Sequence, residues 1–407
     1  MNENKRTPQI RFKGFTDDWE QRKLANLINE YKETVTSDCT LPVLTSSKVD
    51  GVVLQEEHFG RKQNHDITGY NILPYGYCTY RNRSDGIDFT FNINKCCKMG
   101  IISKFYPVFY GNKNNINLIS IILNNSKEVA REIGYTCSGT GQKVLSFLDL
   151  QKMNIIIPNR SEQDKISDLF DNLDNLITLH QRKYDKLVNM KKSMLEKMFP
   201  KNSEKVPEIR FKGFTADWEQ RKLGEIGNTF TGLSGKTKED FGHGEAKFVT
   251  YMNVFSNPIA QLNKTEPIEI DNKQNQVEYG DVFFTTSSET PDEVGMSSVW
   301  LENKGNIYLN SFCFGFRPFV KNDPYYMAYM LRSKNFRKNM ILLAQGISRY
   351  NISKNGVMNI DIQLPNNQEQ EKIGKLFYEI DNLITLHQRK LEKLNSLKKS
   401  MLKKMFV

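Results

Sequence analysis

DNLITLHQRK stands at residues 174–183 and again, letter for letter, at residues 381–390. Each copy is the centre of a longer repeat, in which residues 162–199 match residues 369–406 at 26 of 38 positions. A second repeat lies upstream: PQIRFKGFTDDWEQRKL at residues 8–24 returns as PEIRFKGFTADWEQRKL at residues 207–223, with 15 of 17 positions identical. The chain is therefore one unit written twice, and each unit consists of a lead-in, a divergent block and a long helix.

The repeated end of each unit predicts a long amphipathic helix. Its apolar residues recur at alternating steps of three and four, the heptad spacing of a narrow seam that packs against another long helix. The expected seam positions are Ile166, Leu169, Leu173, Leu176, His180, Leu187, Met190 and Met194 in the first helix, and Ile373, Leu376, Ile380, Leu383, His387, Leu394, Leu397 and Met401 in the second. Pro158 and Pro365 end the preceding segments, and Ser161 or Asn367 is expected to cap the long helix of its unit.

Two helices with matching seams most simply pack against each other, and the block between them favours an antiparallel pair. At ~1.5 Å per residue, each helix would be a rod of ~57 Å. Two similar halves on such a pair are related by an approximate two-fold axis, so the two ends of the chain should meet. The coiled-coil pair would hold the two divergent blocks at a fixed separation and in opposite orientations.

The divergent blocks are expected to be rich in β-strands, because short runs of Ile, Val, Phe and Tyr are broken by Gly, Asn and Asp. The clearest helix inside a block is predicted at residues 323–345. The predicted fold class is α+β, with two mixed, β-rich domains joined by two long antiparallel helices in a pseudo-two-fold repeat. The expected boundaries are 8–158 for the first domain, 159–200 for the first long helix, 207–365 for the second domain and 366–407 for the second long helix.

Composition and charge limit the class of protein. Apolar residues make up 38% of the 407 residues, so each half can bury a core. The net charge of +10 is spread thinly, with +4 in residues 367–407 and −1 in residues 224–366, and gives only modest support to a polyanionic partner. No apolar run is long enough for a transmembrane helix, and the N-terminal residues lack a signal-peptide core, so a cytoplasmic protein is expected.

The cysteines show no C-x-x-C spacing, which indicates free thiols and disfavours a zinc site. They are Cys39, Cys78, Cys96, Cys97, Cys137 and Cys313.

The twice-written order of lead-in, divergent block and long helix resembles the specificity subunit of type I restriction–modification systems. The resemblance covers nearly the whole chain and includes the helix openings NRSEQDKI (159–166) and NQEQEKI (367–373). It implies a non-catalytic subunit that reads an asymmetric, bipartite site in double-stranded DNA. Each block would read one half-site, and the unread spacer between them would be near one helical turn.

The resemblance also implies partner subunits. Two methyltransferase subunits would use S-adenosylmethionine, and motor–nuclease subunits would use ATP and Mg²⁺, whereas this chain would hold no cofactor, no metal and no catalytic residue. DNLITLHQRK would then be written twice because each half docks one methyltransferase subunit.

Base reading requires polar and basic side chains on loops that reach a groove of DNA, with others to hold phosphates. The candidates in the first block are Arg81, Asn82, Arg83, Ser84, Ser138, Thr140, Gln142 and Lys143. The candidates in the second block are Thr285, Thr286, Ser287, Ser288, Gln345, Ser348, Arg349 and Tyr350 for bases, and Ser234, Lys236 and Lys238 for phosphates. The resemblance assigns no individual role to these residues, and an ordinary solvated loop is the competing interpretation of each.

Two other functions fit parts of the sequence. Asp292, Glu302 and Lys304 match the permissive pattern of Mg²⁺-dependent nucleases, in which two carboxylates hold the metal beside a lysine. A scaffold whose blocks bind proteins is the second alternative, and the charge of −1 in residues 224–366 favours it.

Other motifs predict less. TGLSGKT (231–237) is not a P-loop, because Phe230 stands where the first glycine is needed. His180 and His387 lie on the predicted seam, where packing or a polar register role is expected rather than metal binding.

Overall fold

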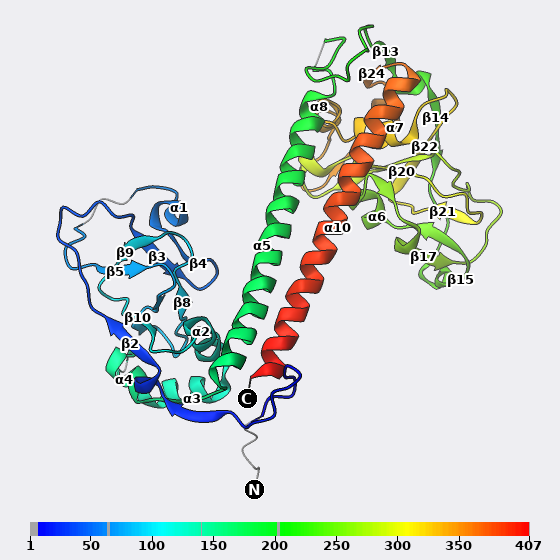
Figure 1. Cartoon of the computed structure of the whole chain (residues 1–407). Coiled ribbons are helices and arrows are strands. Elements are labelled where there is room, and N and C mark those ends of the chain that lie inside the picture. The colour runs from blue at the N-terminus through cyan, green and yellow to red at the C-terminus, as the bar shows by residue number, and fades with distance from the viewer. Residues whose placement is uncertain (1–6, 63–65, 140, 202–203, 407) are drawn as a thin grey trace. The chain divides into compact units, whose positions relative to one another are not determined.

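A computed structural model describes residues 7–62, 66–139, 141–201 and 204–406. The chain forms two compact units, Met1–Leu179 with Lys390–Val407 (unit 1) and His180–Arg389 (unit 2). Each unit contains one β-rich domain and a stretch of both long helices, α5 (Arg160–Lys197) and α10 (Asn367–Met405) (Figure 1). The α+β organisation predicted from the repeat is confirmed.

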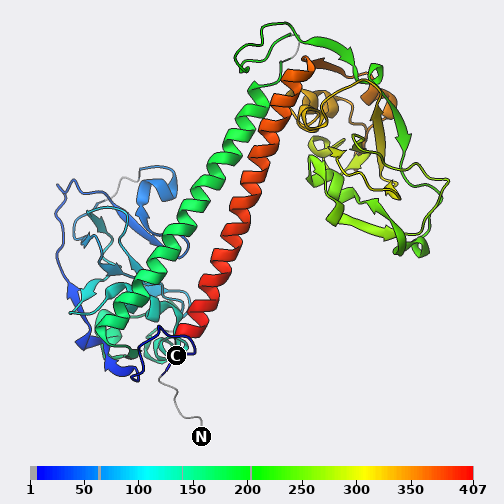
Figure 2. The same ribbon diagram turned by 45° about the vertical axis from the view of Figure 1, so that its right-hand side comes forward.

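The two long helices run antiparallel within each unit (Figure 2). In unit 1, the ring of Phe170 contacts that of Phe406, and Asp174 forms an ion pair with Lys398. In unit 2 the contacts move back along α10 as α5 advances, in the order His180–His387, Lys191–Asp381 and Phe199–Phe377. The antiparallel pairing expected from the matching seams is therefore correct.

The register of the seam differs from the prediction. The buried and half-buried positions that continue the alternating spacing are, in α5, Ile166, Phe170, Leu173, Ile177, His180, Tyr184, Leu187, Lys191 and Met194, followed by Met198 just beyond the helix. The same positions recur in α10, 207 residues later. By contrast, Leu176, Leu383, Met190 and Leu397, which were expected in the seam, are 36–45% exposed. Leu176 is followed by Ile177, and either apolar residue fits the alternating spacing. The prediction placed Leu176 in the seam, whereas the structure places Ile177 there.

The caps of the long helices also differ from the prediction. The Oδ1 atom of Asn159 accepts the amide of Glu162 at 3.1 Å, and that of Asn366 accepts the amide of Glu369 at 3.0 Å. These asparagines, and not Ser161 or Asn367, bind the free amides of the first turn.

Among the described residues, the domain of unit 1 contains several small antiparallel sheets and four α-helices. The largest sheet has the strand order β2-β10-β6-β8, and the others pair β1 with β12, β3 with β4, β5 with β9 and β7 with β11. The strands are β1 (Glu20–Lys23), β2 (Ile28–Tyr31), β3 (Leu44–Ser47), β4 (Gly51–Leu54), β5 (Asn71–Pro74), β6 (Cys78–Thr79), β7 (Arg83–Ser84), β8 (Asn92–Ile93), β9 (Met99–Ile102), β10 (Val108–Gly111), β11 (Lys143–Val144) and β12 (Asn154–Ile157). The helices are α1 (Gln55–Phe59), α2 (Ile116–Asn125), α3 (Lys127–Thr136) and α4 (Phe147–Lys152).

The domain of unit 2 is built around a five-stranded sheet of order β14-β22-β18-β20-β16, with a three-stranded sheet β17-β15-β21 and the pairs β13–β24 and β19–β23. The strands are β13 (Glu219–Lys222), β14 (Gly227–Thr231), β15 (Phe241–Val249), β16 (Ile259–Ala260), β17 (Thr265–Ile268), β18 (Val282–Thr285), β19 (Ser287–Ser288), β20 (Ser297–Trp300), β21 (Ile307–Leu309), β22 (Cys313–Pro318), β23 (Tyr350–Asn351) and β24 (Asp361–Leu364). The helices are α6 (Tyr251–Ser256), α7 (Pro324–Met330), α8 (Lys334–Leu342) and α9 (Lys354–Met358).

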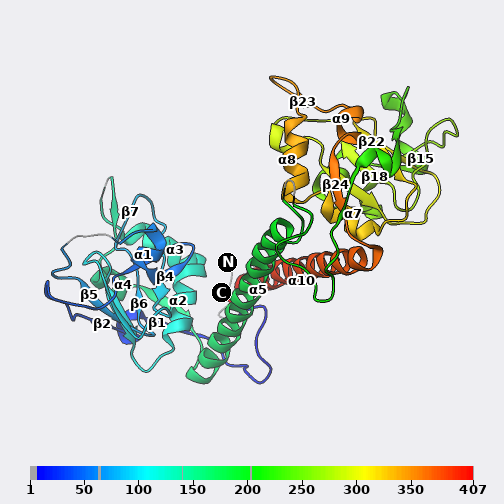
Figure 3. The ribbon, with the colours of Figure 1, turned by 90° about the horizontal axis from the view of Figure 1, so that it is seen from above.

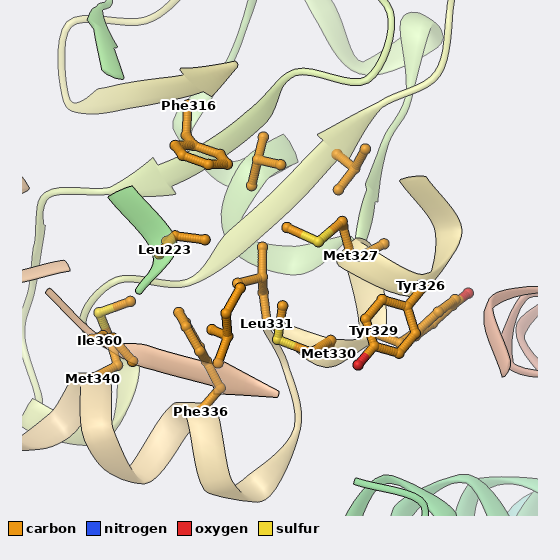
Figure 4. Close-up of a cluster of buried hydrophobic side chains, with 14 of the residues drawn as sticks. Leu223, Phe316, Tyr326, Met327, Tyr329, Met330, Leu331, Phe336, Met340 and Ile360 are labelled. Carbon is orange, nitrogen blue, oxygen red and sulfur yellow. The ribbon is translucent and has the colours of Figure 1, made fainter. Parts of the chain in front are cut away.

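The single helix predicted at residues 323–345 is two helices. Asp323 caps α7, and the Oγ atom of Ser333 accepts the amide of Phe336 to start α8. A cap in mid-segment offers the backbone an alternative to continuing the helix. Tyr326, Met327, Leu331 and Phe336 then pack into the core of this domain (Figure 4).

A buried ion pair joins each lead-in to the start of its long helix. In unit 1 the guanidinium of Arg11 donates two hydrogen bonds to the carboxylate of Glu162, at 2.7 and 2.8 Å. In unit 2 Arg210 makes the same two bonds to Glu369, also at 2.7 and 2.8 Å. Both glutamates are fully buried, and the bond to its glutamate raises the pKa of each arginine. Such bidentate pairs fix orientation as well as position.

The glutamine that follows each buried glutamate holds the divergent domain. Gln163 accepts the backbone amide of Asn115, the N-cap of α2, at 2.9 Å, and Gln370 accepts that of Asp323, the N-cap of α7, at 3.0 Å. Each glutamine also donates to the carbonyl of the proline five residues before it, at 2.9 Å. The repeated Glu-Gln pair is therefore the fixed joint between lead-in, domain and long helix.

The lead-ins also pack on the far end of the partner long helix. In unit 1 the amide of Ile10 donates to the carbonyl of Lys404 at 3.1 Å, so the lead-in meets the end of α10 as expected. In unit 2 the amide of Ile209 donates to the carbonyl of Lys197 at 2.9 Å. Trp19 packs on Phe406 and Trp218 on Phe199, with ring centroids 6.2 and 6.4 Å apart.

The buried pair predicts a large cost for removing one partner. We expect Glu162→Ala to lower the free energy of unfolding of unit 1 by about 3 kcal/mol, because a buried guanidinium loses its counter-ion. The double variant R11M/E162L should lose less of its free energy of unfolding than Glu162→Ala, since an apolar pair needs no counter-ion.

Urea unfolding followed by tryptophan fluorescence measures both variants, and the exposed pair Glu20–Arg22 provides the control. Glu20→Ala should cost less than about 1 kcal/mol. An equal cost for Glu162→Ala and Glu20→Ala would show that the buried pair does not stabilise the joint.

Candidate nucleic-acid interface

Unit 1 brings two predicted loops together in a small β-hairpin-like pair (hairpin 1). Strand β7 pairs antiparallel with β11, so Ser84 lies opposite Lys143 and Arg83 opposite Val144. A further bridge joins Ser138 to Val144. Candidates about 60 positions apart in the sequence therefore share one narrow projection of the domain, around β7 in Figure 3.

Arg83 is exposed on hairpin 1, and its guanidinium packs on an aromatic ring. Its guanidinium lies 4.6 Å from the ring centroid of Phe105, and Lys104 also approaches this ring. Stacking on an aromatic ring restricts the guanidinium while its donors remain available. Asn82 holds the strand in place, because its backbone amide donates a hydrogen bond to the backbone carbonyl of Phe105 at 2.9 Å.

Unit 2 contains an equivalent pair (hairpin 2), made by β19 and β23. Ser287 lies opposite Asn351 and Ser288 opposite Tyr350, and Gln345 exchanges two backbone hydrogen bonds with Asn351. The loop between Gln345 and Asn351 leads into β23 (Figure 3), and its residues Ile347, Ser348 and Arg349 are exposed to solvent.

One glycine shapes the loop of each hairpin. Gly139 has φ +101°, and a Cβ atom there would lie 2.3 Å from the carbonyl oxygen of Gln142. Gly346 has φ +134°, and its Cβ would lie 2.0 Å from the carbonyl oxygen of Arg349. Only glycine fits such a position, so both loops depend on a glycine at the same place although their side chains differ.

Several predicted residues are held inside the domains. Thr285 is fully buried, and its Oγ1 accepts the amide of Met296. The hydroxyl of Thr286 donates to the carbonyl of Phe312 at 2.9 Å, and that of Ser288 donates to the carbonyl of Thr290. These hydroxyls support hairpin 2 rather than face solvent. Arg81 and Gln142 are exposed, and Thr140 lies outside the described residues.

The predicted phosphate contacts lie elsewhere in unit 2, in the loop between β14 and β15. Lys236 is paired with Asp271 at 2.9 Å, and this bond raises the pKa of Lys236 and lowers that of Asp271 to about 2. The positive charge of Lys236 is therefore balanced within the domain. Ser234 and Lys238 are exposed, but no contact joins them to hairpin 2 among the described residues.

Sequence reasoning missed the aromatic and acidic residues beside the hairpins. A cavity of about 290 Å³ next to hairpin 2 has the lining residues Tyr251, Met252, Phe255, Ser287, Ser288, Glu289, Glu293, Phe312 and Arg349. Met252 and Phe312 are each 60% exposed. Phe312 follows Phe105 by 207 positions, the offset of the long-helix repeat, and that offset is the sequence signal that could have identified both.

The remaining candidates for metal, redox or membrane chemistry are few. In the part of the chain that the structure describes, no three His, Cys, Asp or Glu residues are grouped to hold a metal ion, and no helix has the length and apolarity needed to span a membrane. All six cysteines are free thiols. His180 and His387 lie together in the seam of unit 2, with their Nδ1 atoms 2.8 Å apart, so one ring nitrogen donates a hydrogen bond and the other accepts it.

The hairpin geometry predicts a local effect of filling a glycine. Gly139→Ala should open hairpin 1, because the backbone there is strained for any L side chain, at a cost of about 1–3 kcal/mol. Amide hydrogen exchange at Ser138 and Val144 should quicken while the domain core stays protected. Gly141→Ala in the same loop is the control, since nothing lies within 4 Å of its Cβ. Equal exchange in both variants would contradict the role of Gly139.

Comparison with known proteins assigns the fold to a family. The family model described as "Type I restriction modification DNA specificity domain" matches residues 17–189 and 215–396. The chain is 26% identical over 276 residues to the type I restriction enzyme MjaVIII specificity subunit of Methanocaldococcus jannaschii, covering 65% of this chain and 64% of that relative. It is 25% identical over 284 residues to the putative MjaX specificity subunit of the same organism, covering 64% of this chain and 60% of that relative. The chain therefore spans less than two thirds of the length of these curated relatives.

A solved structure supports the same architecture. The type I restriction–modification S subunit from M. genitalium aligns with a TM-score of 0.55 and 15% identity, covering 98% of this chain and 99% of that one, which shows a shared fold. Because the family model matches most of both halves, the chain belongs to the type I restriction–modification DNA specificity family.

Proposed function

We propose that this chain is the non-catalytic, DNA-reading subunit of a cytoplasmic type I restriction–modification complex. The observation that carries the proposal is the pair of hairpins, one in each unit, built on the same glycine geometry but presenting different side chains. A protein that reads two different half-sites needs two such surfaces. The family membership supports double-stranded DNA as the ligand.

The exposed side chains suit direct reading of bases in the major groove. Arg83, steadied by Phe105, suits the two acceptors of a guanine, and Gln142 suits the acceptor and donor of an adenine. In unit 2 Arg349 and Ser348 have the same roles, and the exposed Phe312 suits the methyl group of a thymine. We propose that these residues form the first contacts with each half-site.

The target is proposed to be asymmetric and bipartite. The two hairpins carry different residues, so they read different bases. Two readers that approach one face of a duplex must be about 10 base pairs, or a near multiple, apart. The unread spacer is therefore proposed to be near one helical turn.

The repeated DNLITLHQRK stretch is proposed as the docking surface for the methyltransferase. Leu176 and Leu179 are 44% and 46% exposed in the first copy, and Leu383 and Leu386 are 44% and 45% exposed in the second. Neither pair packs into the core of its own unit. The two pairs consist of the same residue types and are exposed to nearly the same extent. Two matching apolar surfaces suit two copies of one partner.

The partners bring the chemistry in this proposal. The methyltransferase subunits use S-adenosylmethionine, the motor–nuclease subunits use ATP and Mg²⁺, and this chain adds no cofactor. A nuclease site at Asp292, Glu302 and Lys304 is not proposed, because Asp292 precedes β20 and Glu302 follows it, so the length of the strand stands between the two carboxylates. A protein-binding scaffold is the second candidate, and salt-insensitive binding, or no binding of duplex DNA even with the methyltransferase present, would support it.

Exchange of one block tests the two-reader proposal. Replacing residues 25–158 with the corresponding block of another family member should change one half-site of the target and leave the other unchanged. The adenine methylome of cells that express the hybrid with a compatible methyltransferase measures this. A change in both half-sites together would contradict separate readers.

Substitution of the exposed leucines tests docking. L176D/L179D should weaken binding of one methyltransferase subunit at least about 30-fold, since truncated contact residues at such surfaces commonly cost about 2 kcal/mol or more. Native mass spectrometry should then show one methyltransferase per chain in place of two, and L383D/L386D should give the same result.

Leu148→Asp is the control, because Leu148 is 68% exposed and lies outside the repeat. Retention of two methyltransferase subunits by both double variants would place the docking surface elsewhere.

A further inference from the structure

A basic groove lies in unit 1 between α3 and the last turns of α10 (the α3–α10 groove). It has a volume of about 720 Å³. Lys127 and Arg131 line it from α3, and Lys399 and Lys403 line it from α10, with Glu128 as the one carboxylate among its lining residues. Both pairs are spaced by four residues, so each helix presents two cations about 6 Å apart along its axis.

These four cations are not balanced by the protein. Lys127, Arg131, Lys399 and Lys403 are all exposed, and none forms an ion pair or side-chain hydrogen bond with the residues that the structure describes. A fifth lysine of the groove, Lys398, is in contrast paired with Asp174. Cations that repel each other across a groove create a positive potential that favours a polyanion.

Unit 2 contains the equivalent groove with a different charge. It lies between α8 and the end of α5, has a volume of about 280 Å³, and presents Lys334 and Lys338 at the positions of Lys127 and Arg131. Glu196 stands where unit 1 has Lys403, and it forms an ion pair with Lys334. The same framework therefore folds with a glutamate at this position, so packing does not require the lysine.

We infer that the α3–α10 groove of unit 1 binds backbone phosphates of duplex DNA, independently of base sequence, and that unit 2 lacks this grip. The inference rests on the proposed DNA-reading function and adds a phosphate site outside both hairpins. Lysine and arginine contacts to phosphate position a protein on DNA, whereas base contacts specify the sequence.

The position of α3 favours DNA over an acidic protein as the ligand. The helix runs from Lys127 in the groove to Thr136, and Ser138, two residues further, pairs with Val144 in hairpin 1. Ten helical residues span ~15 Å, which is less than half of the ~34 Å turn of a duplex. A duplex seated on hairpin 1 therefore extends far enough to reach the groove.

Charge reversal in the groove tests the inference with a control from the chain itself. K399E/K403E removes two of the four cations, and K403E alone reproduces the Glu196–Lys334 arrangement of unit 2. K186E/K192E makes the same change in net charge on α5, where Lys192 is the counterpart of Lys399 and lies outside both grooves. All these lysines are exposed, so the variants should fold.

The full chain, assembled with a compatible methyltransferase, is titrated with a labelled random-sequence duplex and with its methylated target sequence at about 50 to 200 mM salt. K399E/K403E should bind both duplexes at least about 10-fold more weakly at the lowest salt, with the slope of log K against log salt reduced by about 2. K403E should give a smaller loss, and K186E/K192E should keep the original slope. The methylated motif should be unchanged in every variant.

Each contrary result has a separate meaning. An unchanged salt slope in K399E/K403E, with salt-dependent binding by the unaltered complex, would overturn the groove and leave the proposed function standing. Loss of methyltransferase assembly with unchanged DNA affinity would show an acidic protein partner instead. No salt-dependent binding by the unaltered complex would overturn the proposed function and the groove together.

Discussion

The buried arginine–glutamate pair at the start of each long helix is the constraint on which the rest of each unit depends. Glu162 and Glu369 are fully buried, so each requires its arginine, and the arginine brings the lead-in with it. The glutamine that follows each glutamate accepts a hydrogen bond from the backbone amide of the residue that caps the N-terminus of a domain helix. Two adjacent side chains thus join three segments that are far apart in the sequence. This explains why Glu-Gln and the lead-in are repeated almost without change, whereas the blocks between them diverge.

A rigid joint allows the reading surfaces to vary. Hairpins 1 and 2 keep the backbone geometry that Gly139 and Gly346 make possible, and both rest beside an exposed phenylalanine. Their loops carry different polar residues, and these do not take part in the core. The exposed loop residues, which we propose read bases, can therefore change at little cost in stability, because the burial that stabilises each domain lies in separate clusters. The two grooves at the ends of the long helices follow the same rule, since lysine and glutamate occupy equivalent positions on one framework.

The long helices show that hydrophobic periodicity predicts a helix but does not predict which of two adjacent apolar residues is buried. The alternating three–four spacing predicted the helices and their pairing, and the block between them predicted the antiparallel direction. It did not distinguish Leu176 from Ile177, because both are apolar and a shift of one residue keeps the period. The choice was made by contacts that the helix makes with its own domain as well as with the other helix. Leu176 and Leu383, which the sequence placed in the seam, are exposed, and they belong to the surfaces that we propose for docking.

The sequence by itself determined the two-fold repeat, the α+β class, the long paired helices and the family, because repeats, heptad spacing and proline stops are local properties of the chain. It also identified the segments that form the hairpins. Only the tertiary structure decided that Arg83 faces solvent over Phe105 while Thr285 is buried, and that Lys236 is neutralised by Asp271. The physical reason is that exposure and charge balance depend on residues distant in the sequence. Strand pairing and ion pairing bring these together only when the chain has folded.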